Sequence, residues 1–269
     1  MLKQFRNLCA GLALAGGLAI GAPAFAGFST TEVQLHYGDN YKFGANSTFG
    51  GGFAEETARE TITIEHFSAG KYGTLFFFVD FFRDDEARAP GNNKAGQYGE
   101  IYGFLSAKTL GLSFSENSFI KDVGIEAGIN EGTDFLVGLI GPKVEFNVPG
   151  VQVLTFALYA YDNWVDPVAG RNPDLTYQAT IVWGIPFDIG TQKFRFQGFV
   201  DFIGSQSNGG FQIADQIVFS PQIRWDIGNA FGGAENRFTL GIEYTHFQNK
   251  FGATTADENS ASIFVAMRF

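Results

Sequence analysis

Apolar and polar residues alternate along most of the chain, and this alternation limits the fold more than any other feature. Near the C-terminus, Ile263 and Val265 belong to an alternating apolar set that ends at Phe269. Residues 193–202 and 237–247 follow the same pattern. A period of two is typical of β-strands with one apolar face. Beyond the N-terminal segment, no stretch reaches the roughly 18 to 20 apolar residues that a transmembrane helix needs.

The alternation predicts twelve strands that are joined by connections of two lengths. We expect strands near residues 30–38, 58–67, 73–82, 97–106, 119–129, 135–146, 151–162, 175–185, 193–203, 215–226, 237–247 and 260–269. The long connections, rich in Gly, Asn, Asp and Glu, are 44–57, 83–96, 163–174, 204–214 and 248–259, and the short ones are 68–72, 147–150 and 186–192. This alternation is typical of an up-and-down outer-membrane barrel with short periplasmic turns and long external loops. Connections 107–118, 130–134 and 227–236 depart from it.

The N-terminus predicts a cleaved signal peptide. Lys3 and Arg6 precede an apolar, glycine-containing run at residues 8–22, and Ala24 to Ala26 has the small-x-small pattern of a signal-peptidase site. A retained membrane helix is disfavoured because the apolar run is short and rich in glycine. We therefore expect residues 1–26 to be the signal peptide and residues 27–269 to be the barrel.

Composition excludes several classes of protein. Disorder is excluded because 45% of the residues are apolar and 16% are aromatic, and a single cysteine excludes a disulfide scaffold. Loss of Lys3 and Arg6 with the signal peptide takes the net charge from −10 to −12, which argues against nucleic acid as a partner. The 31 Phe and 35 Gly residues suggest a surface on which aromatic rings face something other than water.

A secreted β-sandwich is the alternative fold for such strands. Charged residues opposite the aliphatic sets fit a wet lumen or a solvent face equally well. The last residue favours the barrel, because outer-membrane barrels commonly finish with an aromatic residue, here Phe269. We therefore predict an all-β, twelve-stranded antiparallel transmembrane β-barrel in the outer membrane of a Gram-negative bacterium. Pro142 and Pro221 lie inside predicted strands, where we expect a bulge or a local break.

Register divides the aromatic residues between lipid and lumen. If Asp80 faces inward, Phe76 and Phe78 do so too, while Phe77 and Phe81 face lipid. A twelve-stranded lumen is narrow, since eight strands nearly fill their interior and sixteen leave an aqueous pore. The candidate lining and substrate-binding residues are Phe43, Glu65, Phe76, Phe78, Asp80, Tyr98, Glu100, Arg195, Asp201, Arg224, Glu243 and Phe264.

Aromatic rings inside a water-filled lumen are unfavourable unless they pack or bind. A file of such rings beside ionisable groups suits a flat, uncharged ring system that bears a sugar, because bases stack on aromatic side chains for roughly 1 to 3 kcal/mol each. Conduction also needs many weak sites rather than one tight site. The alternative is that Phe76, Phe78 and Phe82 fill a constriction or pack beneath an infolded loop, and spacing alone favours neither.

Four segments carry a family resemblance. They are the run from His36 to Gly44, the run ITIEHFSAGKYGTLFFFVD at residues 62–80, and residues 141–162 and 177–202. Together they resemble the nucleoside-specific channel (Tsx-like) and vibrio phage-receptor (OmpK-like) outer-membrane family. The resemblance implies a monomeric twelve-stranded barrel that passes nucleosides by diffusion through a narrow channel lined with aromatic and ionisable residues. The individual candidates named above come from inward register rather than from the family.

Enzymatic and metal-binding motifs give little signal. His66 and Ser68 are predicted to face outward and resemble the pair of twelve-stranded outer-membrane phospholipases, but the neighbouring outward residues Leu75, Phe77 and Val79 offer no polar group to orient the histidine. We therefore expect no catalytic residues. The three histidines lie on separate strands without metal-ligand spacing, so we expect no metal and no cofactor.

Two functions from different classes remain open. The first is a channel for nucleosides. The second is a cell-surface receptor for bacteriophage or another partner that acts through the external loops, since one chain can serve both. Outer-membrane lipid and lipopolysaccharide are the other expected partners, and we expect a monomer.

Overall fold

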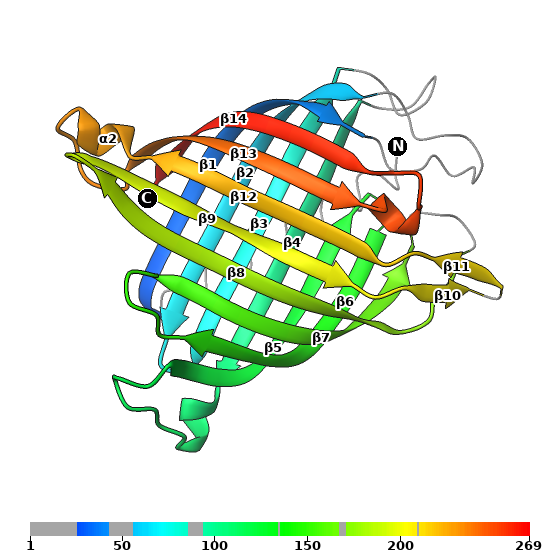
Figure 1. Ribbon diagram of the computed structural model, residues 1–269, viewed down its shortest axis with the longest axis horizontal. Helices are drawn as coiled ribbons and strands as arrows, with labels where there is room; N and C mark the ends of the chain where they lie inside the picture. The colour runs from blue at the N-terminus through cyan, green and yellow to red at the C-terminus, as the bar shows by residue number, and fades with distance from the viewer. Residues whose placement is uncertain (1–25, 43–55, 86–93, 134, 167–170, 209) are drawn as a thin grey trace.

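Twelve strands close into one antiparallel barrel (Figure 1), as the alternation predicts. The computed structural model describes residues 26–42, 56–85, 94–133, 135–166, 171–208 and 210–269. Around the wall the order is β1-β14-β13-β12-β9-β8-β7-β6-β5-β4-β3-β2, so each strand pairs with its sequence neighbour and β1 closes against β14. The predicted signal peptide lies almost wholly outside the described residues and stays a prediction.

The barrel strands are β1 (Ala26–Tyr41), β2 (Thr57–Gly70), β3 (Gly73–Asp84), β4 (Ala95–Ser106), β5 (Ile120–Gly132), β6 (Phe135–Phe146), β7 (Val153–Val165), β8 (Thr176–Ile189), β9 (Gln192–Ile203), β12 (Gln216–Trp225), β13 (Phe238–Gln248) and β14 (Glu258–Arg268). The described connections hold η2 (Ala107–Leu110), the hairpin β10 (Gln206–Asn208) and β11 (Phe211–Ile213), α2 (Ile227–Ala230) and η3 (Lys250–Gly252). Among the residues that the structure describes, no helix is long and apolar enough to cross a membrane.

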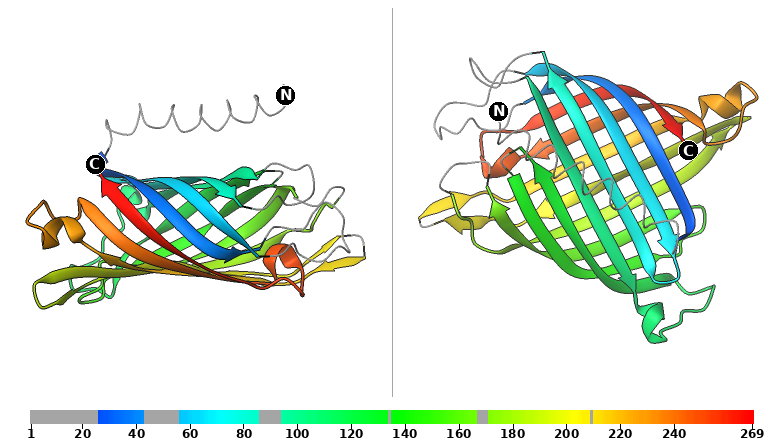
Figure 2. Two further views of the ribbon diagram at one scale, coloured as in Figure 1. Left: turned by 90° about the horizontal axis from the view of Figure 1, so that it is seen from above. Right: turned by 180° about the vertical axis from the view of Figure 1, so that it is seen from behind.

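The two ends of the barrel differ. The end that carries the C-terminus has short turns between β2 and β3 and between β8 and β9, together with the small helices η2 and α2. The opposite end carries the hairpin β10–β11 and η3 (Figures 1 and 2). Two of the connections that departed from the predicted alternation, 107–118 and 227–236, therefore owe their length to short helices at the turn end. Asp226 caps α2 by accepting a hydrogen bond from the backbone N–H of Asn229 at 3.0 Å.

The outward face of the wall is apolar and exposed, which identifies the surrounding medium as lipid. Outward side chains that are more than one third exposed include Leu35, Ile62, Phe81, Ile125, Ile140, Leu158, Phe202, Ile223, Ile242 and Val265. An apolar band of this extent, all around a closed barrel whose backbone groups pair within the wall, is the surface of an outer-membrane barrel. The predicted location, the outer membrane of a Gram-negative bacterium, follows from this fold.

An aromatic belt marks the turn end of the outer surface. The rings of Phe187 and Phe194 stack at 5.4 Å, and Trp225 lies 6.5 Å from Phe194 and 6.5 Å from Phe231. Aromatic rings are favoured at the boundary between hydrocarbon and headgroups, so this belt lies at the level of one membrane interface. Phe194 therefore faces the membrane, as its predicted outward register indicates.

Both prolines make local breaks rather than bulges. Pro142 pairs with Ile125 on β5, but the pairing of β6 with β7 is interrupted at residues 141 and 142. Pro221 likewise pairs with Gly198 on β9, while the pairing of β12 with β13 is interrupted at residues 220 and 221. The register is the same on both sides of each gap. Each proline lacks the N–H that would bond to one neighbouring strand but stays paired with the other, so the wall stays closed.

Aromatic rings lie flat over some of the glycines on neighbouring strands. Phe264 is the cross-strand partner of Gly241, and a Cβ added to Gly241 would lie 2.2 Å from its ring. Tyr102 covers Gly128 in the same way, with an added Cβ at 2.4 Å. A ring over a glycine keeps the backbone covered where no side chain packs, and it narrows the lumen less than two facing side chains.

This packing predicts that Gly241→Ala destabilises the barrel, because the new methyl group displaces the ring of Phe264. We expect a loss of about 1 to 3 kcal/mol in the free energy of unfolding, measured in urea by the fraction of protein that retains the mobility of a folded barrel in an unheated gel. Gly103→Ala is the matched control, since a Cβ there meets nothing within 4 Å. Equal stability of the two variants would contradict this account of the glycines.

Candidate functional site in the barrel lumen

An aromatic track runs along the inside of the wall. The rings of Phe76 and Phe78 on β3 are 6.1 Å apart, Tyr98 on β4 is 6.0 Å from Phe78, and Phe135 on β6 is 6.3 Å from Tyr98. All four rings are half-buried and tilted against one another. The first three are predicted lining residues, and the structure brings them together. We call this set the aromatic track.

Two carboxylates lie beside the aromatic track. Asp80 is the cross-strand partner of Tyr98 and accepts a hydrogen bond from the Thr63 hydroxyl at 2.6 Å. Glu100 is the cross-strand partner of Phe78 and accepts a hydrogen bond from the Tyr98 hydroxyl at 2.5 Å. Neither carboxylate forms an ion pair within the described part of the chain. Their oxygen atoms are therefore positioned as acceptors next to the rings.

Two further predicted carboxylates face the track from other walls of the lumen. Asp201 on β9 accepts a hydrogen bond from the Thr180 hydroxyl at 2.6 Å and interacts electrostatically with Glu100 on β4. Glu243 on β13 accepts a hydrogen bond from Gln222 and interacts with Asp80 on β3. Both pairs reach between strands that are several places apart in the barrel order. The middle of the lumen is thus surrounded by carboxylates that no described Lys or Arg neutralises through an ion pair.

Arginines gather toward the turn end of the lumen. Glu32 is 3% exposed and accepts hydrogen bonds from Arg224 and, at 3.0 Å, from Arg268. Since β1 and β12 are not neighbours, the Glu32–Arg224 pair ties two separate parts of the wall together. Arg195 lies opposite Arg224 on β9 and has no ion pair among the described residues. Glu65 is the cross-strand partner of Glu32, so both glutamates lie at the end of the lumen that holds the arginines.

A cavity of about 430 Å³ opens at this end. Its lining includes Arg195, Arg224, Arg268, Lys193, Asp188 and Asp226. The candidate residues therefore fall into two groups along the barrel, one of rings and carboxylates and one of arginines around Glu32.

Phe264 faces inward, as predicted, but packs instead of lining open space. Its side chain is 1% exposed. The ring stacks on His36 at 4.6 Å, and the guanidinium carbon of Arg224 lies 5.1 Å from the ring centre. With Gly241 on its other side, the ring has no free face for a solute. Phe43, the remaining candidate, lies outside the described residues.

One side of the interior is filled. Val137, Leu139, Ala157, Tyr159, Tyr161 and Ile203 form a buried hydrophobic cluster from β6, β7 and β9. The Tyr159 hydroxyl donates to Glu126 at 2.5 Å, and Lys143 pairs with Glu126 at 2.7 Å. Phe135 of the aromatic track packs against this cluster. Phe82 is 9% exposed and its ring centre lies 4.1 Å from the guanidinium carbon of Arg59, so this ring packs, whereas Phe76 and Phe78 stay half-buried.

Two important residues were missed by the sequence analysis. Glu32 alternates with Gln34 and His36 in a predicted strand, so the register argument used for β3 would have found it. Phe135 begins a predicted strand, and its contact with Tyr98 depends on Gly132 of β5, which pairs with Tyr98 on one side and with Phe135 on the other.

His66 faces outward, and its ring stacks on Phe77 at 5.1 Å. Its Nδ1 shares a hydrogen bond with the Thr31 hydroxyl at 2.9 Å, from the strand opposite the one that sequence reasoning searched. Within the described residues no hydrogen bond links it to Ser68. At the outer surface, His66 thus stacks on Phe77 and is hydrogen-bonded to Thr31. The expectation that the chain has no catalytic activity stays a prediction.

Comparisons with known proteins show the fold. No protein-family model and no curated protein matches the chain. An outer membrane channel from Pseudomonas putida F1 is similar in structure, with a TM-score of 0.52, 10% sequence identity, and coverage of 91% of this chain and 96% of that one. A structure described as the KdgM porin matches with a TM-score of 0.45 and 8% identity over 88% of this chain and 99% of that one. The fold is that of an outer-membrane β-barrel. The resemblance to the nucleoside-channel family finds no support in these matches and stays a prediction.

The carboxylates around the middle of the lumen predict a preference for cations over anions. Rings of acidic side chains select cations, and Glu100→Gln removes one such charge beside the aromatic track. We expect the reversal potential in a KCl gradient to show K⁺ selectivity that falls in Glu100→Gln. Glu60→Gln, on the exposed outward face of β2, is the control with the same change of charge and should behave like the wild type. Anion selectivity of the wild-type protein would contradict this description of the lumen.

Proposed function

We propose that the protein is a diffusion channel for small molecules in the outer membrane, and that nucleosides are its solutes. The closed barrel with an apolar exterior supports the first part. The aromatic track with Asp80 and Glu100 at its edge supports the second. The position of these carboxylates directly beside the rings is the single observation that carries the proposal, because a solute stacked on a ring can also donate a hydrogen bond to the neighbouring carboxylate.

The aromatic track suits the base of a nucleoside. Successive rings at 6.0 to 6.3 Å are close enough for a base to leave one ring as it meets the next. Stacking contributes about 1 to 3 kcal/mol per base, which is enough to attract a solute and too little to hold it. A channel needs this kind of weak, repeated site.

The carboxylates suit the sugar and disfavour charged relatives. Asp80 and Glu100 can each accept a hydrogen bond from a ribose hydroxyl, since neither is held in an ion pair among the described residues. Their negative charge, with that of Asp201 and Glu243, repels phosphate groups. The proposal therefore expects neutral nucleosides to be preferred over nucleotides.

Channel block tests this proposal. Adenosine added to single channels in a planar bilayer should reduce the K⁺ current in a saturable manner, and glucose or AMP at equal concentration should not. A wild-type current that adenosine leaves unchanged would contradict specificity for nucleosides and leave the outer-membrane channel as the function.

Phe78→Ala tests the role of the track. Loss of one stacking face should weaken adenosine block by about 5- to 100-fold, with little change in the current without adenosine. Phe81→Ala, on the lipid side of the same strand and 40% exposed, is the matched control and should retain full block. If Phe78→Ala instead raises the current for every solute, Phe78 fills the lumen and does not bind.

The second function from sequence, a receptor for bacteriophage, depends on the external loops. Residues 43–55, 86–93 and 167–170 of those loops lie outside the described residues, so this function stays a prediction, as do lipopolysaccharide binding and the monomeric state.

A further inference from the structure

The turn η3 reaches across the mouth of the barrel and adds a ring to the aromatic track. Phe251 in this turn lies 6.5 Å from Phe135 on β6 and 5.9 Å from Phe247 on β13, measured between ring centres. Four strands, β12, β9, β8 and β7, separate β13 from β6 in the barrel order. The turn therefore spans from one wall toward the other, and Phe251 joins the end of the track that Phe135 forms.

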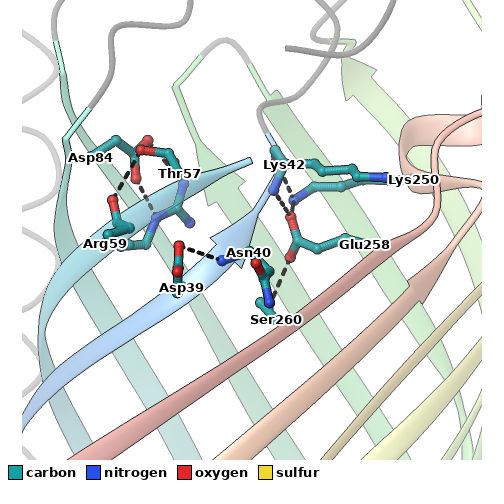
Figure 3. A network of polar contacts seen from close by, with 10 residues as sticks. Asp39, Asn40, Lys42, Thr57, Arg59, Asp84, Lys250, Glu258 and Ser260 are labelled. Carbon is teal, nitrogen blue, oxygen red and sulfur yellow. Dashed lines mark hydrogen bonds and ion pairs between the residues drawn. The ribbon is translucent and has the colours of Figure 1, made fainter. Parts of the chain in front are cut away.

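The turn is held from several directions. Lys250 is 8% exposed, pairs with Glu258 and donates a hydrogen bond to the carbonyl of Lys42 at 2.9 Å (Figure 3). Gly252 accepts from the backbone N–H of Ala214 at 3.0 Å.

Arg171 of the β7–β8 connection also reaches the turn. Its guanidinium lies 3.4 Å from the carbonyl oxygen of Phe251. Together with Lys42 and Ala214, this makes three parts of this end of the barrel that hold the backbone of the turn that carries the ring. Its place beside Phe135 is thus determined by the fold.

The backbone of Phe251 is strained in this position. Its φ is 57° and its ψ is 28°, a left-handed conformation that bulky residues rarely adopt and that glycine adopts easily. Strain of this kind persists where surrounding contacts enforce it, and it is concentrated at ligand clamps. A phenylalanine here gives the mouth a half-buried ring that a glycine would not supply.

We propose that Phe251 is the outer end of the aromatic track. It is the first ring that a nucleoside meets when it enters from the loop end, the end of the barrel that carries η3 and the hairpin β10–β11. This inference rests on the proposed function. The ring sets the rate of entry from that end, whereas Phe78 farther along the track sets how long the solute stays.

Block kinetics measured from each side of the bilayer test the inference. Phe251→Leu keeps an apolar side chain of similar size but removes the aromatic face. We expect the rate constant of adenosine entry from one side to fall by at least about fivefold, the lower limit for one stacked ring, with entry from the other side and the current without adenosine unchanged. Phe251→Tyr should restore entry.

Phe231→Leu is the control, because Phe231 is 85% exposed beside α2 at the opposite end. Folded mobility in an unheated gel confirms that each variant is intact. If adenosine blocks the wild type and enters the Phe251→Leu channel from each side as fast as it enters the wild type, the inference is wrong while the proposed function stands. If Phe251→Leu instead increases the passage of glucose and adenosine alike, Phe251 only fills the mouth. A wild type that adenosine does not block contradicts the proposed function itself.

Discussion

Closure of β1 against β14 is the constraint on which the rest of the structure depends. In hydrocarbon every backbone N–H and C=O must be paired within the protein, so a sheet of twelve strands is viable there only without an edge. Eight cross-strand pairs, from Glu32 with Arg268 to Asp39 with Ala261, close the wall. Glu32 also binds Arg224 across the interior, so the strand that closes the barrel anchors the arginine end of the lumen. Closure and lining are thus fixed by the same register.

That register gives the aromatic rings different roles. Rings such as Phe81 and Phe194 face lipid or the membrane interface, and rings such as Phe264 cover glycines on the next strand. Phe76 and Phe78 belong to neither group. They stay half-buried beside carboxylates that lack ion pairs among the described residues, and the proposed solute site rests on this combination.

Local sequence determines strand and face, whereas the site depends on contacts between distant strands. Alternation was enough to locate all twelve strands and to turn Phe76, Phe78 and Tyr98 inward, because each face follows from a period of two. It also placed the breaks at Pro142 and Pro221. It did not show that Phe264 is buried over Gly241, since that depends on which residues pair between β13 and β14. Nor did it indicate Phe251, because a turn that crosses the mouth leaves no periodic signal.

Photo-crosslinking with 8-azidoadenosine tests the central claim most directly, because it reports where a nucleoside sits inside the barrel. The protein in detergent is irradiated with the probe, digested and analysed by mass spectrometry. The account predicts adducts within residues 73–84 and 95–106, the strands that carry Phe76, Phe78 and Tyr98, and predicts that excess adenosine removes them while glucose does not. Adducts confined to other strands, or adducts that adenosine fails to remove, would contradict a nucleoside track in this lumen.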